Sequence, residues 1–250
     1  FNATDFLYLT YRPDERWSFS GGKQIVAIGG YEYDLAPIDI YFVSEYCSNI
    51  ACYQMGVSAG YSFDQRRDRL SFQVCQSPFR REHSDLYAYN LMWNGNRGCF
   101  DSIWSLNLIE YLPGKFINYL ALGNQFTFGN FCVFADFMNR SLVDKMSFLR
   151  DFTLIGKVTY SFNDRLKVFG KASYDRNDLD EEGDWCVSPG TSIGRVGCGV
   201  EFFPLADKRV RLHAALCHTF GDNGNPAGSL LPDSQFLSFG LTWRMSLLGN

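Results

Sequence analysis

The stretch LIGKVTYSFNDRLKVFGKASYD, residues 154–175, alternates between two kinds of side chain on either side of a short turn. Apolar and aromatic side chains occupy one set of alternate positions, and most of the polar ones, three lysines among them, occupy the other. A period of two is typical of β-strands, so the stretch predicts a hairpin. The three-residue turn at 163–165 predicts the register in which Lys157 lies directly opposite Lys171.

Segments of the same kind recur along the whole chain, and no amphipathic helix competes with them. They cover more than half of the residues, whereas strands make up about 20–25% of an ordinary soluble domain. About thirteen are recognisable, with approximate limits 4–12, 17–25, 53–63, 68–78, 86–93, 101–111, 116–128, 131–139, 150–162, 166–175, 192–203, 209–219 and 235–246. Since no linker or change of composition separates them, the sequence predicts one all-β domain over residues 1–250.

The connections between these segments alternate in length. Those after the first segment and every second one thereafter are short: 13–16, 64–67, 94–100, 129–130, 163–165 and 204–208. The others are mostly long, with 112–115 the short exception: 26–52, 79–85, 140–149, 176–191 and 220–234. Short turns at one end and long loops at the other are typical of an antiparallel up-and-down transmembrane β-barrel. A Greek-key sandwich has no reason to sort its loops in this way.

Two interpretations of the apolar strand faces remain open. In an outer-membrane barrel these faces contact lipid, and the lysine faces line a lumen. In a soluble or surface β protein, exposed aromatic residues would bind carbohydrate. Aromatic residues near the predicted strand ends favour the membrane, because its interfaces attract them: Trp17, Tyr61, Trp93, Trp104, Tyr111, Phe162, Phe202 and Trp243. A net charge of −4 without a basic run argues against nucleic acid as a partner.

The order of turns and loops also predicts an orientation. If the short turns are periplasmic, the last segment ends in the periplasm and the first one starts outside the cell. Bacterial single-chain barrels have an even number of strands and both ends in the periplasm. We therefore expect an odd number of strands to be missing before residue 1, and three more would give the sixteen of a general porin.

Three stretches resemble the phosphate-selective porin O and P family of Gram-negative outer membranes. They are SGGKQIVAIGGYEYDLAPIDIYF at 20–42, GVEFFPLADKRVRLHAALCHTFG at 199–221 and FLSFGLTWRMSL at 236–247. The resemblance implies a sixteen-stranded homotrimeric channel in the outer membrane, surrounded by lipid. It also implies a lumen narrowed by an inward-folded loop and by basic residues on the wall. The long segment 26–52 is where such a loop would fall.

Alternation places a row of cations on the expected lumen wall. These candidates are Arg69, Lys157, Lys167, Lys171, Arg195, Arg211 and Arg244. Cations inside a low-dielectric tube raise the local concentration of anions, so the row favours passage of anions, phosphate among them. The alternative is a solvated face whose charge is offset by Glu110, Asp136 and Glu201, which share the same predicted face.

Segment 26–52 contributes four acidic candidates: Glu32, Asp34, Asp39 and Glu45. Folded into the lumen, these carboxylates would oppose the wall cations and create a transverse field that orients dipolar solutes. The alternative is an ordinary surface loop. Together, these features predict a passive diffusion channel for small hydrophilic solutes.

The remaining reactive residues suggest no chemistry. Eight cysteines are scattered singly along the chain, and only Cys47 and Cys52, in one predicted loop, are close enough in sequence to suggest a disulfide. No spacing of cysteine or histidine predicts a metal site. No serine is brought beside a histidine by any recognisable pattern, so we expect no enzymatic activity and no cofactor.

Overall fold

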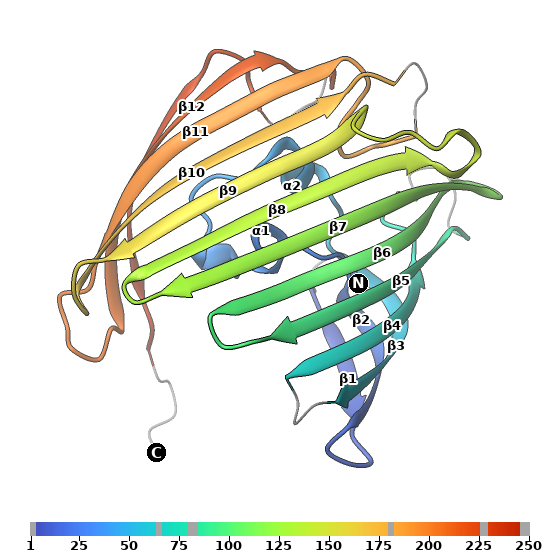
Figure 1. Ribbon diagram of the computed structural model, residues 1–250, viewed down its shortest axis with the longest axis horizontal. Helices are drawn as coiled ribbons and strands as arrows, with labels where there is room; N and C mark the ends of the chain where they lie inside the picture. Colours follow the sequence, from blue (N-terminus) through green and yellow to red (C-terminus); the bar gives the residue numbers. More distant parts are fainter. Residues whose placement is uncertain (1–3, 64–66, 80–84, 180–182, 226–229, 246–250) are drawn as a thin grey trace.

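The computed structural model describes residues 4–63, 67–79, 85–179, 183–225 and 230–245. Thirteen antiparallel strands form one strongly curved sheet, and each strand pairs with its neighbours in sequence (Figure 1). The strands are β1 (Leu7–Tyr11), β2 (Trp17–Ile25), β3 (Tyr53–Phe63), β4 (Asp68–Gln76), β5 (Tyr87–Asn96), β6 (Phe100–Leu112), β7 (Lys115–Phe128), β8 (Phe131–Leu142), β9 (Asp151–Ser161), β10 (Leu166–Asn177), β11 (Thr191–Phe202), β12 (Val210–Asp222) and β13 (Gln235–Trp243). The all-β, up-and-down architecture predicted from the sequence is therefore confirmed.

The register of the β9–β10 hairpin is also as predicted. Lys157 pairs with Lys171 across the two strands, and Val158 pairs with Gly170. The turn is held by Asn163, whose Oδ1 accepts hydrogen bonds from the backbone N–H groups of Arg165 at 2.8 Å and Leu166 at 3.0 Å. A short polar side chain that bonds the backbone two residues ahead is a common turn device.

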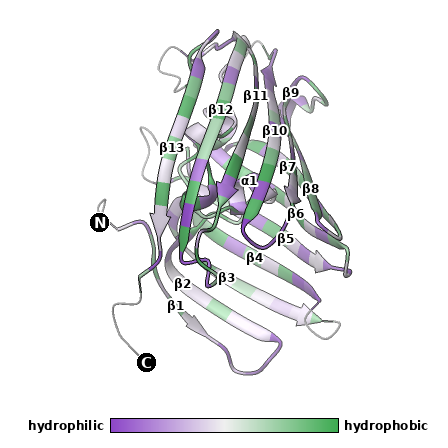
Figure 2. Cartoon of the chain, turned by 90° about the vertical axis from the view of Figure 1, so that its left-hand side faces the viewer, coloured by the Kyte–Doolittle hydropathy of each residue, from purple (hydrophilic) through white to green (hydrophobic). Residues whose placement is uncertain are grey.

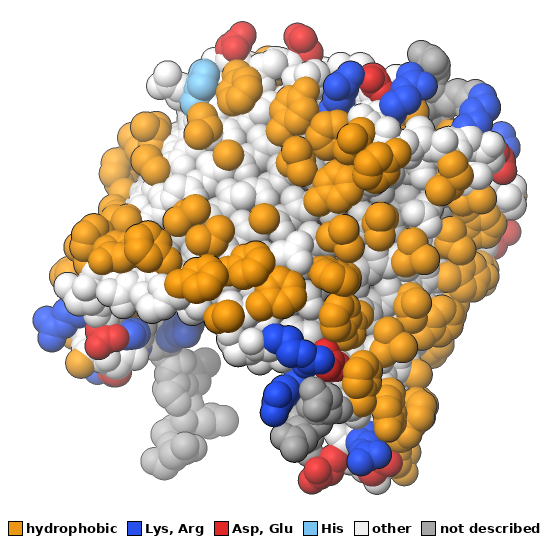
Figure 3. Space-filling view, in the orientation of Figure 1, with side chains coloured by type: hydrophobic (Ala, Val, Ile, Leu, Met, Phe, Trp, Pro, Cys, Tyr) orange, Lys and Arg blue, Asp and Glu red, His pale blue; other side chains and the backbone are white. Residues whose placement is uncertain are grey.

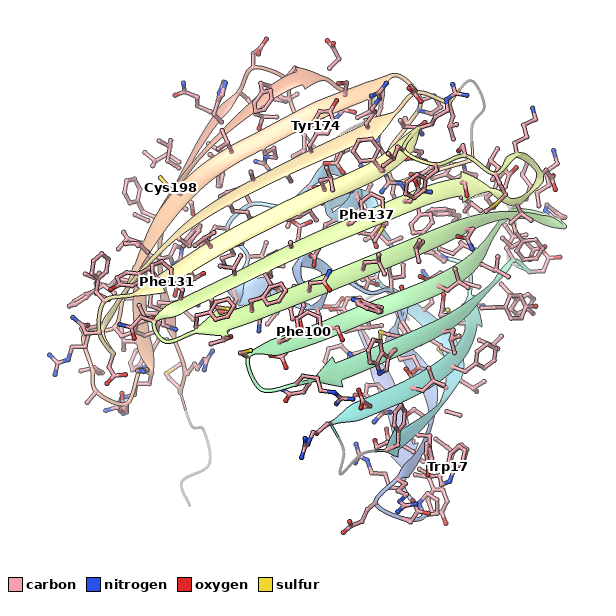
Figure 4. The ribbon with its side chains drawn as sticks, in the orientation of Figure 1. Trp17, Phe100, Phe131, Phe137, Tyr174 and Cys198 are labelled. Atoms are coloured by element: carbon pink, nitrogen blue, oxygen red, sulfur yellow. The ribbon has the colours of Figure 1, made fainter. Side chains whose placement is uncertain are left out.

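The convex face of the sheet is apolar. Figure 3 shows hydrophobic side chains over the middle of this wall, with charged side chains gathered along its two ends. Figure 4 shows Phe137, Tyr174 and Cys198 on the same face. The side chains of Leu9 and Val57 are 79% and 61% exposed. Such an apolar band between charged rims is what a membrane-spanning barrel presents to lipid, and it argues against a water-facing surface.

Aromatic residues pair between strands near the end of the sheet that carries the short turns, called here the short-turn end. The ring centroids of Trp17 and Tyr61 are 4.8 Å apart, and those of Trp93 and Trp104 are 4.9 Å apart. Trp17 is seen near this end in Figure 4. Tyr111 corrects the predicted set, because its side chain is buried in the interior instead of lying on the outer rim.

The segment between β2 and β3 lies inside the curved sheet. It contains α1 (Tyr31–Asp34), the 3-10 turn η1 (Pro37–Asp39) and α2 (Glu45–Asn49). Figures 1 and 2 both show α1 on the concave side, and Figure 2 shows hydrophilic and hydrophobic residues alternating along the strands. One further 3-10 turn, η2 (Val143–Lys145), follows β8. In the described part of the chain, no helix is long and apolar enough to cross a membrane.

A hydrophobic cluster fills part of the interior near the end of the sheet that carries the long loops, called here the long-loop end. Tyr46 of α2 and Tyr119 of β7 contact each other in this cluster, where Cys186 and Val187 from the β10–β11 loop are also fully buried. A second loop thus enters the barrel, which the sequence did not predict. Cys47 and Cys52 both carry free thiols, as do the other cysteines, so the suggested disulfide between them is wrong.

Candidate pore constriction

The inward-folded segment begins as an extended stretch that forms hydrogen bonds with a row of polar side chains on the wall. The backbone N–H of Ala27 donates to Gln73 Oε1 at 2.8 Å, and the carbonyl of Ala27 accepts from Asn107 Nδ2 at 2.8 Å. The next contact is from the N–H of Gly29 to Ser105 Oγ, also at 2.8 Å. These side chains point inward from β4 and β6 and satisfy backbone groups that would otherwise be buried without partners.

Two aspartates on the wall cap the two short helices of this segment. Asp136 on β8 accepts hydrogen bonds from the N–H groups of Tyr31 at 2.9 Å and Glu32 at 2.8 Å. Asp175 on β10 accepts from the N–H group of Glu45 at 2.9 Å. Carboxylates suit helix N-termini because the first N–H groups have no partner within the helix. The wall therefore dictates where each helix starts.

Three of the predicted wall cations bind the segment directly. Lys171 Nζ lies 2.5 Å from Glu32 Oε1 and donates to the carbonyl of Phe42 at 2.6 Å. Arg195 Nη1 donates to the carbonyl of Val43 at 2.6 Å.

The third of these cations is Arg211. Its Nη1 lies 2.5 Å from Asp39 Oδ1, and its Nη2 donates to the carbonyl of Ile38. Arg211, Lys171 and Arg195 are nearly buried, so they hold the loop to the wall and do not stand free along an open passage.

The four acidic candidates of the loop also differ in whether they form an ion pair with the wall. Glu32 and Asp39 are paired with wall cations, as just described. Glu45 is buried, and its carboxylate accepts from Asn49 Nδ2 at 2.7 Å; it forms no ion pair within the described residues. Asp34, at the end of α1, is exposed to the interior space and is likewise without an ion pair in the described part of the chain.

Sequence reasoning missed a buried charge cluster near the long-loop end. Arg140 on β8 lies 2.8 Å from Asp151 and 2.6 Å from Asp184, and all three side chains are fully buried. The guanidinium also lies over the rings of Tyr46 and Tyr119 at 5.7 Å and 5.8 Å. Because Asp184 belongs to the β10–β11 loop and Tyr46 to α2, this cluster joins both inward loops to the wall.

At the short-turn end, beneath the loop, lies a cavity of about 440 Å³, the cationic chamber. Its basic lining residues are Lys157, Lys167, Lys208, Arg209, Arg211 and Arg244, and the acids among its described lining residues are Asp39 and Glu201. Lys208 and Arg209 are paired with Asp164 and Asp207. Lys157 and Lys167 lie over the rings of Phe169 and Phe203 and form no ion pair with any residue that the structure describes. Their charges are therefore available to a solute.

The other predicted residues lie elsewhere. Arg69 is inside the barrel but on its opposite side, where it donates to Ser18 Oγ at 2.7 Å. The acids expected to offset the cations do not act together: Asp136 caps α1, and only Glu201 lines the chamber. Glu110 alternates on β6 with Ile109 and Tyr111, which are buried inside, and it accepts from the N–H of Gly114 at 2.7 Å, so its predicted place on the lumen face is wrong.

An apolar convex wall, a polar interior and a loop folded into that interior define an outer-membrane β-barrel of the porin type. The profile of the phosphate-selective porin O and P family matches residues 2–97, which confirms the resemblance seen in the sequence over that part of the chain. The match and the fold together indicate the outer membrane of Gram-negative bacteria. A sequence search of curated proteins finds no match for this chain.

Solved structures with the same fold include outer membrane proteins of Vibrio cholerae. A loop L8 deletion mutant of OmpT has a TM-score of 0.62 at 14% identity, over 96% of this chain and 79% of that one. OmpT folded in vitro gives 0.58 at 11% identity, over 94% and 86%. A trimer form of in-vitro folded OmpT gives 0.56 at 14% identity, over 91% and 76%. At these identities the likeness concerns the fold alone.

Proposed function

We propose that this protein is a passive diffusion channel for small hydrophilic solutes, with a preference for anions. The observation that carries the proposal is the loop 26–52, fastened inside the barrel by Lys171, Arg195 and Arg211. It lies above a chamber in which Lys157 and Lys167 form no ion pair with a described residue. A fixed loop narrows the lumen, and a surplus of cations at the narrow part raises the local concentration of anions.

The cations have two different roles, since some bind the loop and others face the solute, and this difference supports the proposal. Lys171 and Arg211 are paired with loop carboxylates, Arg195 is hydrogen-bonded to a loop carbonyl, and together these residues set the width of the passage. The charges of Lys157 and Lys167 are available to a solute, and the exposed Arg244 also lines the chamber. The solute class that fits is a small hydrated anion, phosphate included.

We also propose that more strands complete the wall. In the described residues β1 and β13 each have one strand neighbour and do not pair with each other. Unpaired backbone groups at a sheet edge are not tolerated in lipid. Three further strands would close a sixteen-stranded barrel, and assembly as a homotrimer follows the family resemblance and the trimer form of OmpT.

Planar bilayers test the proposal. Purified full-length protein should give discrete conductance steps, and in a salt gradient its zero-current potential should have the sign of an anion-preferring channel. An unboiled sample should also migrate differently from a boiled one in detergent electrophoresis, as folded barrels do. A protein that is soluble without detergent and shows one mobility would contradict the channel and favour a soluble carbohydrate-binding protein.

A further inference from the structure

A second cavity lies on the other side of the inward-folded loop and has a different character. It has a volume of about 390 Å³, lies between the loop and the inner face of β1–β4, and is called here the polar chamber. Its neutral lining is mixed: six hydroxyl or amide side chains from the strands, Tyr8 and Tyr33, and six apolar residues, which are Phe6, Met92 and the stretch 25–28. Such a surface suits a small solute that carries both polar and apolar groups.

Three charged side chains are among the described residues that line the polar chamber. Arg12 and Arg69 come from the wall, and Asp34 comes from the loop. None of the three forms an ion pair with a residue that the structure describes; Arg69 donates one hydrogen bond to Ser18. The positive charges on the wall and the negative charge on the loop are therefore both available to a solute in the same cavity.

An unused hydrogen-bond donor adds to this site. Gln24 is 8% exposed and lines the polar chamber. Its Oε1 accepts from Ser58 Oγ at 3.0 Å, whereas its Nε2 is buried and has no hydrogen-bond partner among the described residues. A buried amide donor without a partner is unfavourable unless a solute or water supplies the acceptor. The vacant donor points to an occupant that carries acceptor oxygens.

We propose that the polar chamber is a second selective region of the channel, which binds and orients small zwitterions, solutes with one carboxylate and one ammonium group, as in a free amino acid. The inference rests on the proposed channel function and names a solute class for this side of the lumen. A carboxylate pairs with Arg12 or Arg69, and an ammonium group pairs with Asp34. A simple anion gains the contact with arginine but is repelled by Asp34. The polar chamber therefore distinguishes zwitterions from simple anions, whereas the cationic chamber does not.

Swelling of proteoliposomes that contain the full-length protein tests this inference. The probes are alanine and lactamide, isomers of the same mass, of which only alanine is a zwitterion. Asp34→Asn and, separately, Arg69→Gln should each lower the alanine-to-lactamide rate ratio about threefold or more, the effect of one partly screened charge contact. Asp144→Asn, a change at an exposed acid in η2, is the matched control and should leave the ratio unchanged.

The outcomes separate this inference from the channel itself. Swelling in both probes with the same ratio in wild type, Asp34→Asn and Arg69→Gln overturns the zwitterion site and leaves the channel standing. No swelling in either probe, with folding verified by the heat-dependent mobility shift, overturns both. A lowered ratio in both variants, but not in Asp144→Asn, supports the polar chamber as a zwitterion site.

Discussion

Lys171 Nζ lies 2.5 Å from Glu32 Oε1, and the two side chains are 5% and 1% exposed. The ammonium group also reaches the carbonyl of Phe42, so one wall residue binds the loop at two places. Removing two charges from water is costly, and the pair is tolerated because each group satisfies the other. Replacing either partner of this ion pair alone would therefore leave the other one as an unpaired buried charge.

Lys171→Met should destabilise the folded barrel by about 3–5 kcal/mol, because it leaves Glu32 buried without its partner. Urea unfolding in detergent, followed by tryptophan fluorescence, measures the change. Single-channel conductance should rise as the loop leaves the wall. The double variant Glu32→Gln/Lys171→Met should recover part of the stability; a Lys171→Met protein as stable as wild type would contradict the anchoring role.

Close approach of the loop to β7 gives a second prediction. A Cβ added at Gly123 would lie 2.7 Å from Gly30 Cα, whereas one added at Gly156 would have nothing within 4 Å. Gly123→Ala should destabilise the barrel by about 1–3 kcal/mol through overpacking, and Gly156→Ala should not destabilise it. The urea midpoints of the two variants provide the comparison, and equal midpoints would show that α1 can move away from the wall at no cost.

Cys132 is a native reporter of the cationic chamber, because it lines the cavity together with Lys157. In a Cys99→Ser/Cys198→Ser background, which removes the two exposed thiols, a negatively charged methanethiosulfonate should label Cys132 severalfold faster than a positively charged one. Mass spectrometry identifies the labelled residue. Lys157→Glu should reduce the difference between the two rates; equal rates in the background without that change would mean that the chamber carries no net positive potential.

Acid should abolish the zwitterion preference of the polar chamber. Burial raises the pKa of Asp34, so its carboxylate takes up a proton at a higher pH than a free aspartate, whose pKa is about 3.9. The other charged or titratable side chains that line the chamber are Arg12, Arg69, Tyr8 and Tyr33. The alanine-to-lactamide ratio should fall as pH falls through the raised pKa, and Asp34→Asn should show no such step.

The strands and their register could be predicted because both depend on local signals. Alternation gives the two faces, and a three-residue turn gives the pairing of Lys157 with Lys171, which the structure has. The contacts of the loop could not be predicted in the same way. Asp136 and Tyr31 are 105 residues apart and Arg195 and Val43 are 152 apart, and no local pattern marks either pair.

Alternation also gives the face of a side chain but not its depth or its partner. Lys157 and Lys171 share a face and lie opposite each other, yet only Lys171 meets an acid of the loop. The ion pair of Arg140 with Asp184 could not be predicted either, because Asp184 lies in a long loop and nothing in the sequence indicates that this loop enters the barrel. The sequence therefore indicates which cations face the lumen, and the structure indicates which of them are not bound to the loop and can interact with a solute.

The zero-current potential of Lys157→Glu/Lys167→Glu shows directly whether these two lysines give the channel its preference for anions. These two lysines line the cationic chamber without ion pairs to described residues, and neither holds the loop, so their replacement changes the charge of the passage and leaves the Lys171 anchor in place. In planar bilayers under a potassium chloride gradient, the full-length wild type should prefer anions, and the variant should shift toward cations at similar conductance. An unchanged potential, with folding confirmed by heat-dependent mobility, would contradict the account and leave a general channel without charge selection.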